Sequence, residues 1–124
     1  MKIYLMSFII SLVFSTLLTA QDSTEEVKYE MKTYYMAFLK KGPNRSVDST
    51  EVQKIQAAHM DHINKMVEDK KLVIAGPFLD DGDIRGIFIF NVETMEEAIA
   101  LTEADPAVKA GRLIMEIHPW WGAK

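Results

Sequence analysis

The sequence predicts an α+β fold in which strands and helices follow one another in the order β-α-β-β-α-β, the ferredoxin-like arrangement. Four apolar segments are rich in β-branched and aromatic residues and are bounded by Gly, Pro, Asn and Asp, which is typical of strands. Two other segments place apolar residues at spacings of three and four, which is typical of helices. A chain of 124 residues has room for a single core of this kind.

The first strand and the first helix come from the segment between residues 33 and 66. Residues 33–39 (TYYMAFL) are predicted to form a strand that stops at the turn composition of residues 41–44. A helix then begins at Asp48 or Ser49, with Glu51 placed for a capping contact in its first turn. Spacings of three and four put the following residues on one face of this helix: Val52, Ile55, His59, Ile63 and Met66.

The second half of the chain supplies the remaining elements. Residues 72–75 form a short apolar strand closed by Gly76-Pro77, and residues 84–92 form the next strand after a turn at residues 80–83. Thr94 opens a Thr-x-x-Glu capping box, which predicts a second helix to about Glu103. The last predicted strand covers residues 112–118.

Two of the predicted strands are apolar on both alternating faces, at residues 34–39 and 87–90. Such strands need cover on both sides of the sheet. Two helices can cover one face, and nothing else in the domain can cover the other. We therefore expect a face-to-face homodimer in which a second copy of the sheet closes the open face around a pocket.

The first 20 residues have the layout of a secretory signal peptide. Lys2 precedes an almost wholly apolar run that ends on the small residue Ala20. The rival interpretation is a retained membrane anchor, because the run approaches the length of a membrane span. Dilution by Ser and Thr and the acidic residues that follow favour cleavage. We expect a signal peptide at residues 1–20, a polar leader at 21–32, a domain at 33–124, and a periplasmic or secreted protein free of the membrane.

Composition excludes several classes of function. The chain carries 18 acidic and 14 basic side chains, a net charge of −4, and it shows no basic cluster interleaved with aromatic residues, so no nucleic-acid partner is expected. The absence of cysteine excludes disulfides, thiolate nucleophiles and Cys-based metal sites. No Gly-rich nucleotide-binding loop and no nucleophile-elbow serine are present, so the expected chemistry needs no cofactor.

Two residues are candidates for chemistry, and each has a structural alternative. His59 lies among aliphatic neighbours, where it is either a core histidine with one hydrogen bond or a general acid or base. Asp105 precedes Pro106, the pattern of a helix N-cap, but its carboxylate can also orient an imidazole. His62 forms a His-x-x-His pair with His59, yet no third ligand has a recognisable spacing, so no metal site is predicted.

A resemblance to a known family rests on two motifs. The first is His59-Met60-Asp61-His62-Ile63, with Gly76-Pro77 seventeen residues after His59. The second is the segment ADPAVKAG at residues 104–111. From about residue 33 to residue 121 the chain resembles the YCII family of YciI-like proteins. The resemblance implies a dimeric α+β barrel and a His59/Asp105 pair that transfers protons. The expected export signal and the short turn at residues 78–83 depart from the commoner form of the family and leave the substrate open.

Three further residues are candidate ligand contacts. Arg85 is placed to reach an anionic group, although an arginine beside a turn is often only solvated. Tyr35 and Phe88 supply aromatic surface for a pocket, or for the core. His118, before Pro119 and two tryptophans, is a weaker candidate at a strand end.

The sequence leaves three functions open. The first is a cofactor-free hydrolase, isomerase or lyase that acts on a small cyclic or aromatic compound through His59 and Asp105. The second is a non-catalytic dimer that binds a small ligand in the same inter-subunit pocket. The third is a structural dimer in which His59 is packed and inert.

Overall fold

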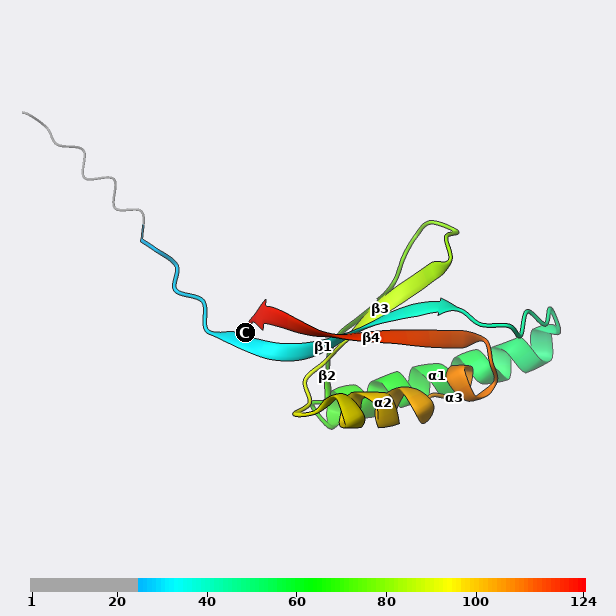
Figure 1. The fold of residues 1–124 in the computed structure, drawn as a ribbon. Helices are drawn as coiled ribbons and strands as arrows, with labels where there is room; N and C mark the ends of the chain where they lie inside the picture. Colours follow the sequence, from blue (N-terminus) through cyan, green and yellow to red (C-terminus); the bar gives the residue numbers. More distant parts are fainter. Residues whose placement is uncertain (1–24) are drawn as a thin grey trace, which may run out of the picture.

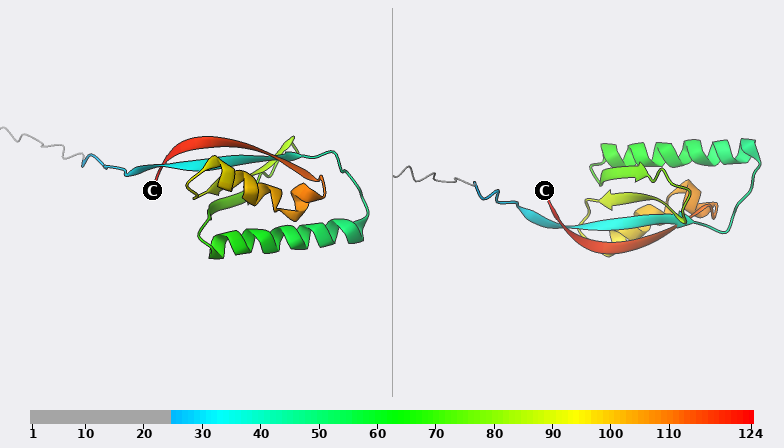
Figure 2. Two further views of the ribbon diagram at one scale, coloured as in Figure 1. Left: turned by 60° about the horizontal axis from the view of Figure 1, so that its bottom comes forward. Right: turned by 90° about the horizontal axis from the view of Figure 1, so that it is seen from above.

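The structure is a computed structural model that describes residues 25–124, so the predicted signal peptide lies outside the described residues. A four-stranded antiparallel sheet has the strand order β2-β3-β1-β4, and all three helices lie against one of its faces (Figures 1 and 2). The elements are β1 (Met31–Lys41), α1 (Ser49–Glu68), β2 (Leu72–Pro77), β3 (Ile84–Phe90), α2 (Met95–Glu103), α3 (Pro106–Lys109) and β4 (Leu113–Ala123). The predicted fold class is confirmed, with α3 as a short additional turn of helix.

Helix α1 begins as its sequence predicts. Asp48 is the N-cap, and its Oδ1 accepts the backbone N–H groups of Thr50 and Glu51 at 3.0 Å each. The side chain of Glu51 accepts the hydroxyl of Ser46 at 3.1 Å. None of the described helices combines the length and apolar character that a membrane span requires.

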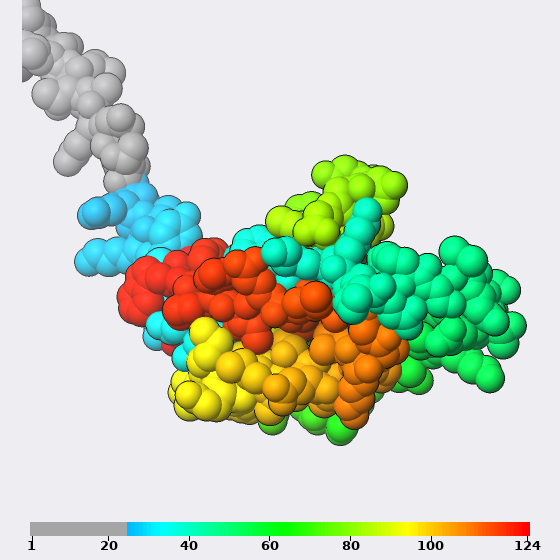
Figure 3. Space-filling view, turned by 45° about the vertical axis from the view of Figure 1, so that its right-hand side comes forward, coloured from blue at the N-terminus to red at the C-terminus, as the bar shows by residue number. Residues whose placement is uncertain are grey.

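The core lies between the sheet and the helices. Ala37 of β1 pairs with Phe88 of β3, and both side chains point toward the helices because cross-strand partners share a face. The other buried members of this cluster are Leu39, Met66, Leu72, Phe90, Val92 and Ala98. The space-filling view shows α2 and α3 (yellow to orange) packed directly against β4 (red), while the loop between β2 and β3 (yellow-green) projects from the body (Figure 3).

The opposite face of the sheet carries no helix in the described part of the chain (Figure 2). Its apolar side chains come from all four strands and are Tyr34, Met36, Phe38, Ile74, Ile87, Ile89, Ile114 and Trp120. Among its polar side chains, Glu116 lies 3.6 Å from Lys40 and 3.2 Å from His118. We call this helix-free surface the open face.

Strand β4 is longer than the sequence predicted. The expected end at His118 is wrong, because the strand continues through Pro119 and two tryptophans to Ala123. Proline donates no backbone hydrogen bond, which usually ends a strand. Within the described sheet, however, β4 lies at the edge and pairs with β1 alone. Strand β3 ends two residues earlier than expected, at Phe90.

Candidate functional site

His59 lies on the face of α1 that points toward the sheet. Its ring is nearly parallel to that of Phe88 on β3, with an angle of 17° between the planes and 6.0 Å between the ring centroids. Only 8% of the residue is exposed. The helical spacing of α1 therefore places an imidazole between the helix and the sheet, among apolar side chains, as the sequence pattern indicated.

Asp105 approaches His59 from a different element. It is the N-cap of α3, where Pro106 occupies the first helical position and Asp105 Oδ1 accepts the N–H of Ala107 at 2.8 Å. The packing of α3 against α1 brings its carboxylate to the imidazole, with Nδ1 of His59 2.9 Å from Oδ1 and 2.8 Å from Oδ2. Residues 46 positions apart in the chain thus lie in direct contact.

The environment of this pair determines which ring nitrogen carries a proton. The Asp105 side chain is fully buried, and His59 is its only charge partner among the described residues. A buried carboxylate requires hydrogen-bond donors, so Nδ1–H of His59 donates to it. Nε2 has no hydrogen-bond partner in the described part of the chain. No completely buried side-chain nitrogen there lacks a partner, so Nε2 keeps some exposure to solvent.

A cavity of about 470 Å³ lies beside His59, between α1 and the helix-covered face of the sheet. This volume lies in the range of small-molecule sites, about 300–1,000 Å³. Most of its lining is apolar, and its polar side chains are Arg45, Gln56, His59, Arg85 and Arg112. The strands that are apolar on both faces predicted a pocket between the sheets of two protomers. That expectation is wrong for this cavity, because His59 faces the covered side of its own sheet.

The structure brings together two of the three predicted ligand contacts. Phe88 and Arg85 both line the cavity with His59. Tyr35 does not line it, and its assignment to the site is corrected. Tyr35 pairs with Phe90, one step along the same face from the Ala37–Phe88 pair, and it packs against the core cluster instead.

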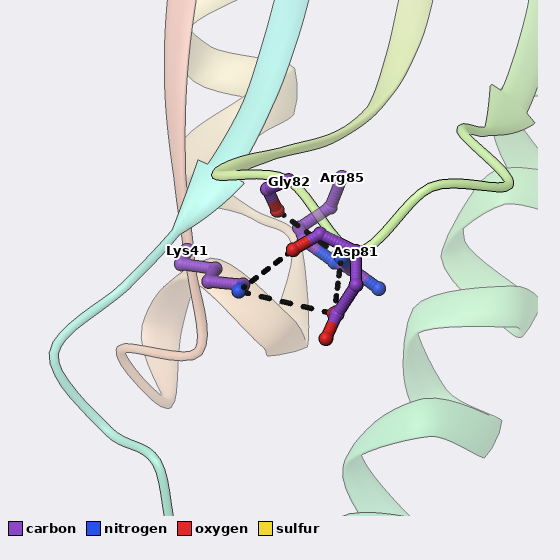
Figure 4. A network of polar contacts seen from close by, with 4 residues as sticks. All are labelled: Lys41, Asp81, Gly82 and Arg85. Carbon is purple, nitrogen blue, oxygen red and sulfur yellow. Dashed lines mark hydrogen bonds and ion pairs between the residues drawn. The ribbon is translucent and has the colours of Figure 1, made fainter.

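Arg85 is fixed by contacts at the tip of the β2–β3 hairpin. Its Nη1 donates to Asp81 Oδ1 and to the carbonyl of Gly82, at 3.2 Å each. Lys41 approaches the same aspartate, with Nζ 3.9 Å from Oδ1 (Figure 4). Because the Asp81 side chain is 97% exposed, these ion pairs contribute little to stability.

Sequence reasoning missed Arg45 and Arg112, which also line the cavity. Arg45 lies in the loop between β1 and α1, and Arg112 lies between α3 and β4. Neither residue belongs to a periodic pattern. The available signal was topological, since each arginine follows a turn (Pro43-Asn44 and Gly111) and both turns lie at the same end of the predicted sheet.

The other two histidines have separate structural roles. Nε2 of His62 donates to the carbonyl of Leu101 at 2.8 Å and links α1 to α2. His118 lies on the open face, beside Glu116. The described residues contain no group of three or more His, Asp or Glu side chains arranged to hold a metal ion.

Comparison with known proteins identifies the domain. The family model described as YCII-related domain matches residues 33–121. The uncharacterized protein YjpA of Bacillus subtilis (strain 168) is 30% identical over 64 residues, which are 52% of this chain and 73% of YjpA.

A solved structure is similar in fold. It is the 5-chloro-2-hydroxyhydroquinone dehydrochlorinase TftG from Burkholderia phenoliruptrix AC1100, in complex with 2,5-dihydroxybenzoquinone. The TM-score is 0.54 at 25% sequence identity, and the match covers 70% of this chain and 92% of that one. The sheet with helices on one face is thus an architecture found in an enzyme that acts on a small ring compound.

Proposed function

Because the chain belongs to the YCII-related domain family, we propose that it is a cofactor-independent enzyme that acts on a small cyclic or aromatic compound. In this proposal the compound binds in the cavity beside His59, and His59 and Asp105 transfer a proton to or from it. The reaction is of the hydrolase, isomerase or lyase type, because each of these needs proton transfer and no redox group.

One observation carries the proposal: a histidine that lines a cavity is held on one ring nitrogen by a buried carboxylate, and its other ring nitrogen has no hydrogen-bond partner among the described residues. Nδ1 of His59 lies 2.8 Å from Asp105 Oδ2, and the carboxylate is fully buried. This is the base–orienter arrangement of acid–base enzymes. A purely structural histidine has no need for a free nitrogen beside a cavity of ligand size.

The chemistry follows from the two nitrogens. In a base step, Nε2 accepts a proton from the bound compound, and the imidazolium that forms is stabilised by the Asp105 carboxylate on Nδ1. In an acid step, the same Nε2–H returns the proton to a leaving group or to another ring position. Phe88, which lies nearly parallel to the imidazole, provides an apolar wall for a flat ring.

The neighbour in fold supports this reaction class. That protein is a dehydrochlorinase, and loss of hydrogen chloride from an organic compound requires a base that takes up a proton. At 25% identity the neighbour does not specify the substrate of this chain. We extend to this chain only the class, a small ring compound that undergoes proton transfer.

The proposal includes an exported homodimer. The apolar run of residues 1–20 is proposed to direct export and to be cleaved, which places the domain in the periplasm or outside the cell. The open face is proposed to pack on the same face of a second copy, because half-exposed apolar side chains there, such as Ile74 and Trp120, lack cover in one protomer.

The test is turnover by the wild-type protein and by His59→Gln. Hydroxylated and chlorinated hydroquinones are the compounds to screen, with 2,5-dihydroxybenzoquinone as the binding probe. We expect His59→Gln to lower turnover by about 10²–10⁴-fold while binding of the probe changes little. Gln56→Leu, a polar-to-apolar change at another side chain of the same cavity, controls for altered lining.

The outcomes separate the catalytic proposal from a binding protein. Loss of turnover in His59→Gln, with an unchanged circular dichroism spectrum, supports acid–base catalysis. If the wild-type protein binds ring compounds but turns none of them over, and His59→Gln binds equally well, the protein is a non-catalytic binder.

A further inference from the structure

Among the residues that the structure describes, three arginines line the cavity beside His59, and no aspartate or glutamate does. The arginines are Arg45, Arg85 and Arg112. This concentration of positive charge contrasts with the chain as a whole, whose net charge is −4. A cavity whose lining charges share one sign raises the local concentration of ligands of the opposite sign.

Arg45 and Arg112 are held by the same pair of loops. Nη1 of Arg112 donates to the carbonyl of Ser46 at 3.0 Å, and Nη2 of Arg45 donates to the backbone carbonyl of Arg112 at 2.8 Å. The loops approach so closely that a Cβ on Gly42 would lie 2.2 Å from the carbonyl oxygen of Gly111. The backbone that carries both arginines is therefore held in place by contacts between the two loops.

Each of these two guanidinium groups keeps donors for a ligand. A guanidinium has five N–H groups. Arg45 uses its Nε and Nη2 atoms on backbone carbonyls, and Arg112 uses only Nη1. Neither forms an ion pair with a carboxylate in the described residues. Two like charges held by the same loops repel one another, and a bound anion relieves that repulsion.

Arg85 differs in this respect. Its Nη1 already donates to the Asp81 carboxylate and to a backbone carbonyl of the hairpin. Its charge is partly offset within the chain. Of the three arginines, Arg45 and Arg112 are the two without a carboxylate partner among the described residues.

We infer that Arg45 and Arg112 bind an anionic oxygen group of the ligand, a carboxylate or an ionised ring hydroxyl, and orient its ring toward Nε2 of His59. This inference rests on the proposed function and specifies its substrate class: an anionic ring compound. Guanidinium groups suit such a group because their planar N–H donors match two oxygens of a carboxylate.

The test compares two ring compounds of similar size, benzoate and benzyl alcohol, which differ in charge. Each compound is titrated into the ¹⁵N-labelled full-length protein, and the arginine Nε–H and backbone resonances are followed. We expect benzoate to shift the Nε–H signals of Arg45 and Arg112 and to bind more tightly than benzyl alcohol. Arg45→Gln and Arg112→Gln should each weaken benzoate binding by about tenfold, with little effect on the alcohol.

Lys54→Gln is the matched control, because it removes one positive charge from the exposed side of α1, outside the cavity lining. It should leave benzoate binding unchanged. A loop disturbed by the arginine substitutions would weaken both compounds equally, so the ratio of the two affinities reports charge recognition alone. Arg112→Lys should restore part of that ratio.

The outcomes for the anion site and for catalysis are separate. Equal affinity for the two compounds, or a ratio unaffected by both arginine substitutions, overturns the anion site, as does the absence of any shift with benzoate. Arginine-dependent benzoate binding supports the anion site even if no compound is turned over, in which case only the proposed catalysis fails.

Discussion

At the scale of single residues, the carboxylate of Asp105 combines two tasks. Its Oδ1 accepts the N–H of Ala107 at the start of α3, and both of its oxygens lie within 2.9 Å of His59 Nδ1. Removal of the carboxylate would therefore disturb the helix end and the candidate site together. An asparagine at this position keeps one oxygen for the cap, so it separates the two tasks.

We predict that Asp105→Asn changes the tautomer of His59. The asparagine oxygen keeps the bond to Ala107, and its NH₂ group then faces Nδ1 of His59, which must become an acceptor. The proton of the neutral ring moves to Nε2, and the base facing the cavity is lost. Imidazole ¹⁵N chemical shifts will report Nδ1–H in the wild type and Nε2–H in the variant; an unchanged tautomer would contradict the assigned contact.

A second prediction concerns Glu116 on the open face. The hydrogen bond from His118, with a further contribution from Lys40, lowers the pKa of Glu116 below its ordinary value. A lowered pKa means that the stabilisation is present above the ordinary pKa and is lost as the pH falls through the folded value. In a ¹³C carboxyl titration, His118→Phe should raise the pKa of Glu116 more than Lys40→Met does. The reverse order would contradict the assigned main cause.

At the scale of elements, α1 was the most predictable part of the chain. Asp48 supplies a cap and the apolar residues recur at helical spacing, so local chemistry specifies both where the helix starts and which face is buried. The end of β4 was not predictable in this way. Whether a strand tolerates Pro119 depends on its position at the sheet edge, which is a property of the assembled sheet.

The candidate site was likewise predictable only in part. The inward direction of His59 follows from the periodicity of α1, but its contact with Asp105 was expected only from the family resemblance. Arg45 and Arg112 were not predicted because loop residues follow no periodic pattern. The two arginines come close together only because two turns of the folded chain pack against one another. Tyr35 was misplaced because alternation gives the face of a strand and not the position of a cavity along it.

The cap of α1 supports a prediction about stability. Asp48→Ala removes the acceptor of two backbone N–H groups, those of Thr50 and Glu51. We expect the free energy of unfolding to fall by about 1 kcal/mol in urea denaturation. Asp61→Ala, an exposed aspartate in the middle of the same helix, should change it by less than about 0.5 kcal/mol. Equal effects of the two substitutions would refute the cap.

At the scale of the whole molecule, the open face predicts self-association. Ile74 on this face and Val67 on α1 are 51% and 52% exposed, so they form a matched pair that differs in location. Ile74→Glu should dissociate the proposed homodimer, because it introduces a charge into a surface that a second copy covers, whereas Val67→Glu should not. Sedimentation velocity at micromolar concentration gives the masses. A wild-type monomer would remove the dimer from the proposal.

The start of β1 pairs with the end of β4, and this pairing has a practical consequence. Met31 faces Ala123, and the N–H of Lys124 donates to the carbonyl of Glu30 at 2.9 Å. These ends lie at one extremity of the sheet, whereas the loop from β1 to α1, which carries Arg45, lies at the other (Figure 1). A linker attached after Lys124 therefore starts far from the loop that carries Arg45, one of the residues that line the cavity. The protein is therefore suited to immobilisation on a sensor surface through its C-terminus, with ligands arriving from the free side.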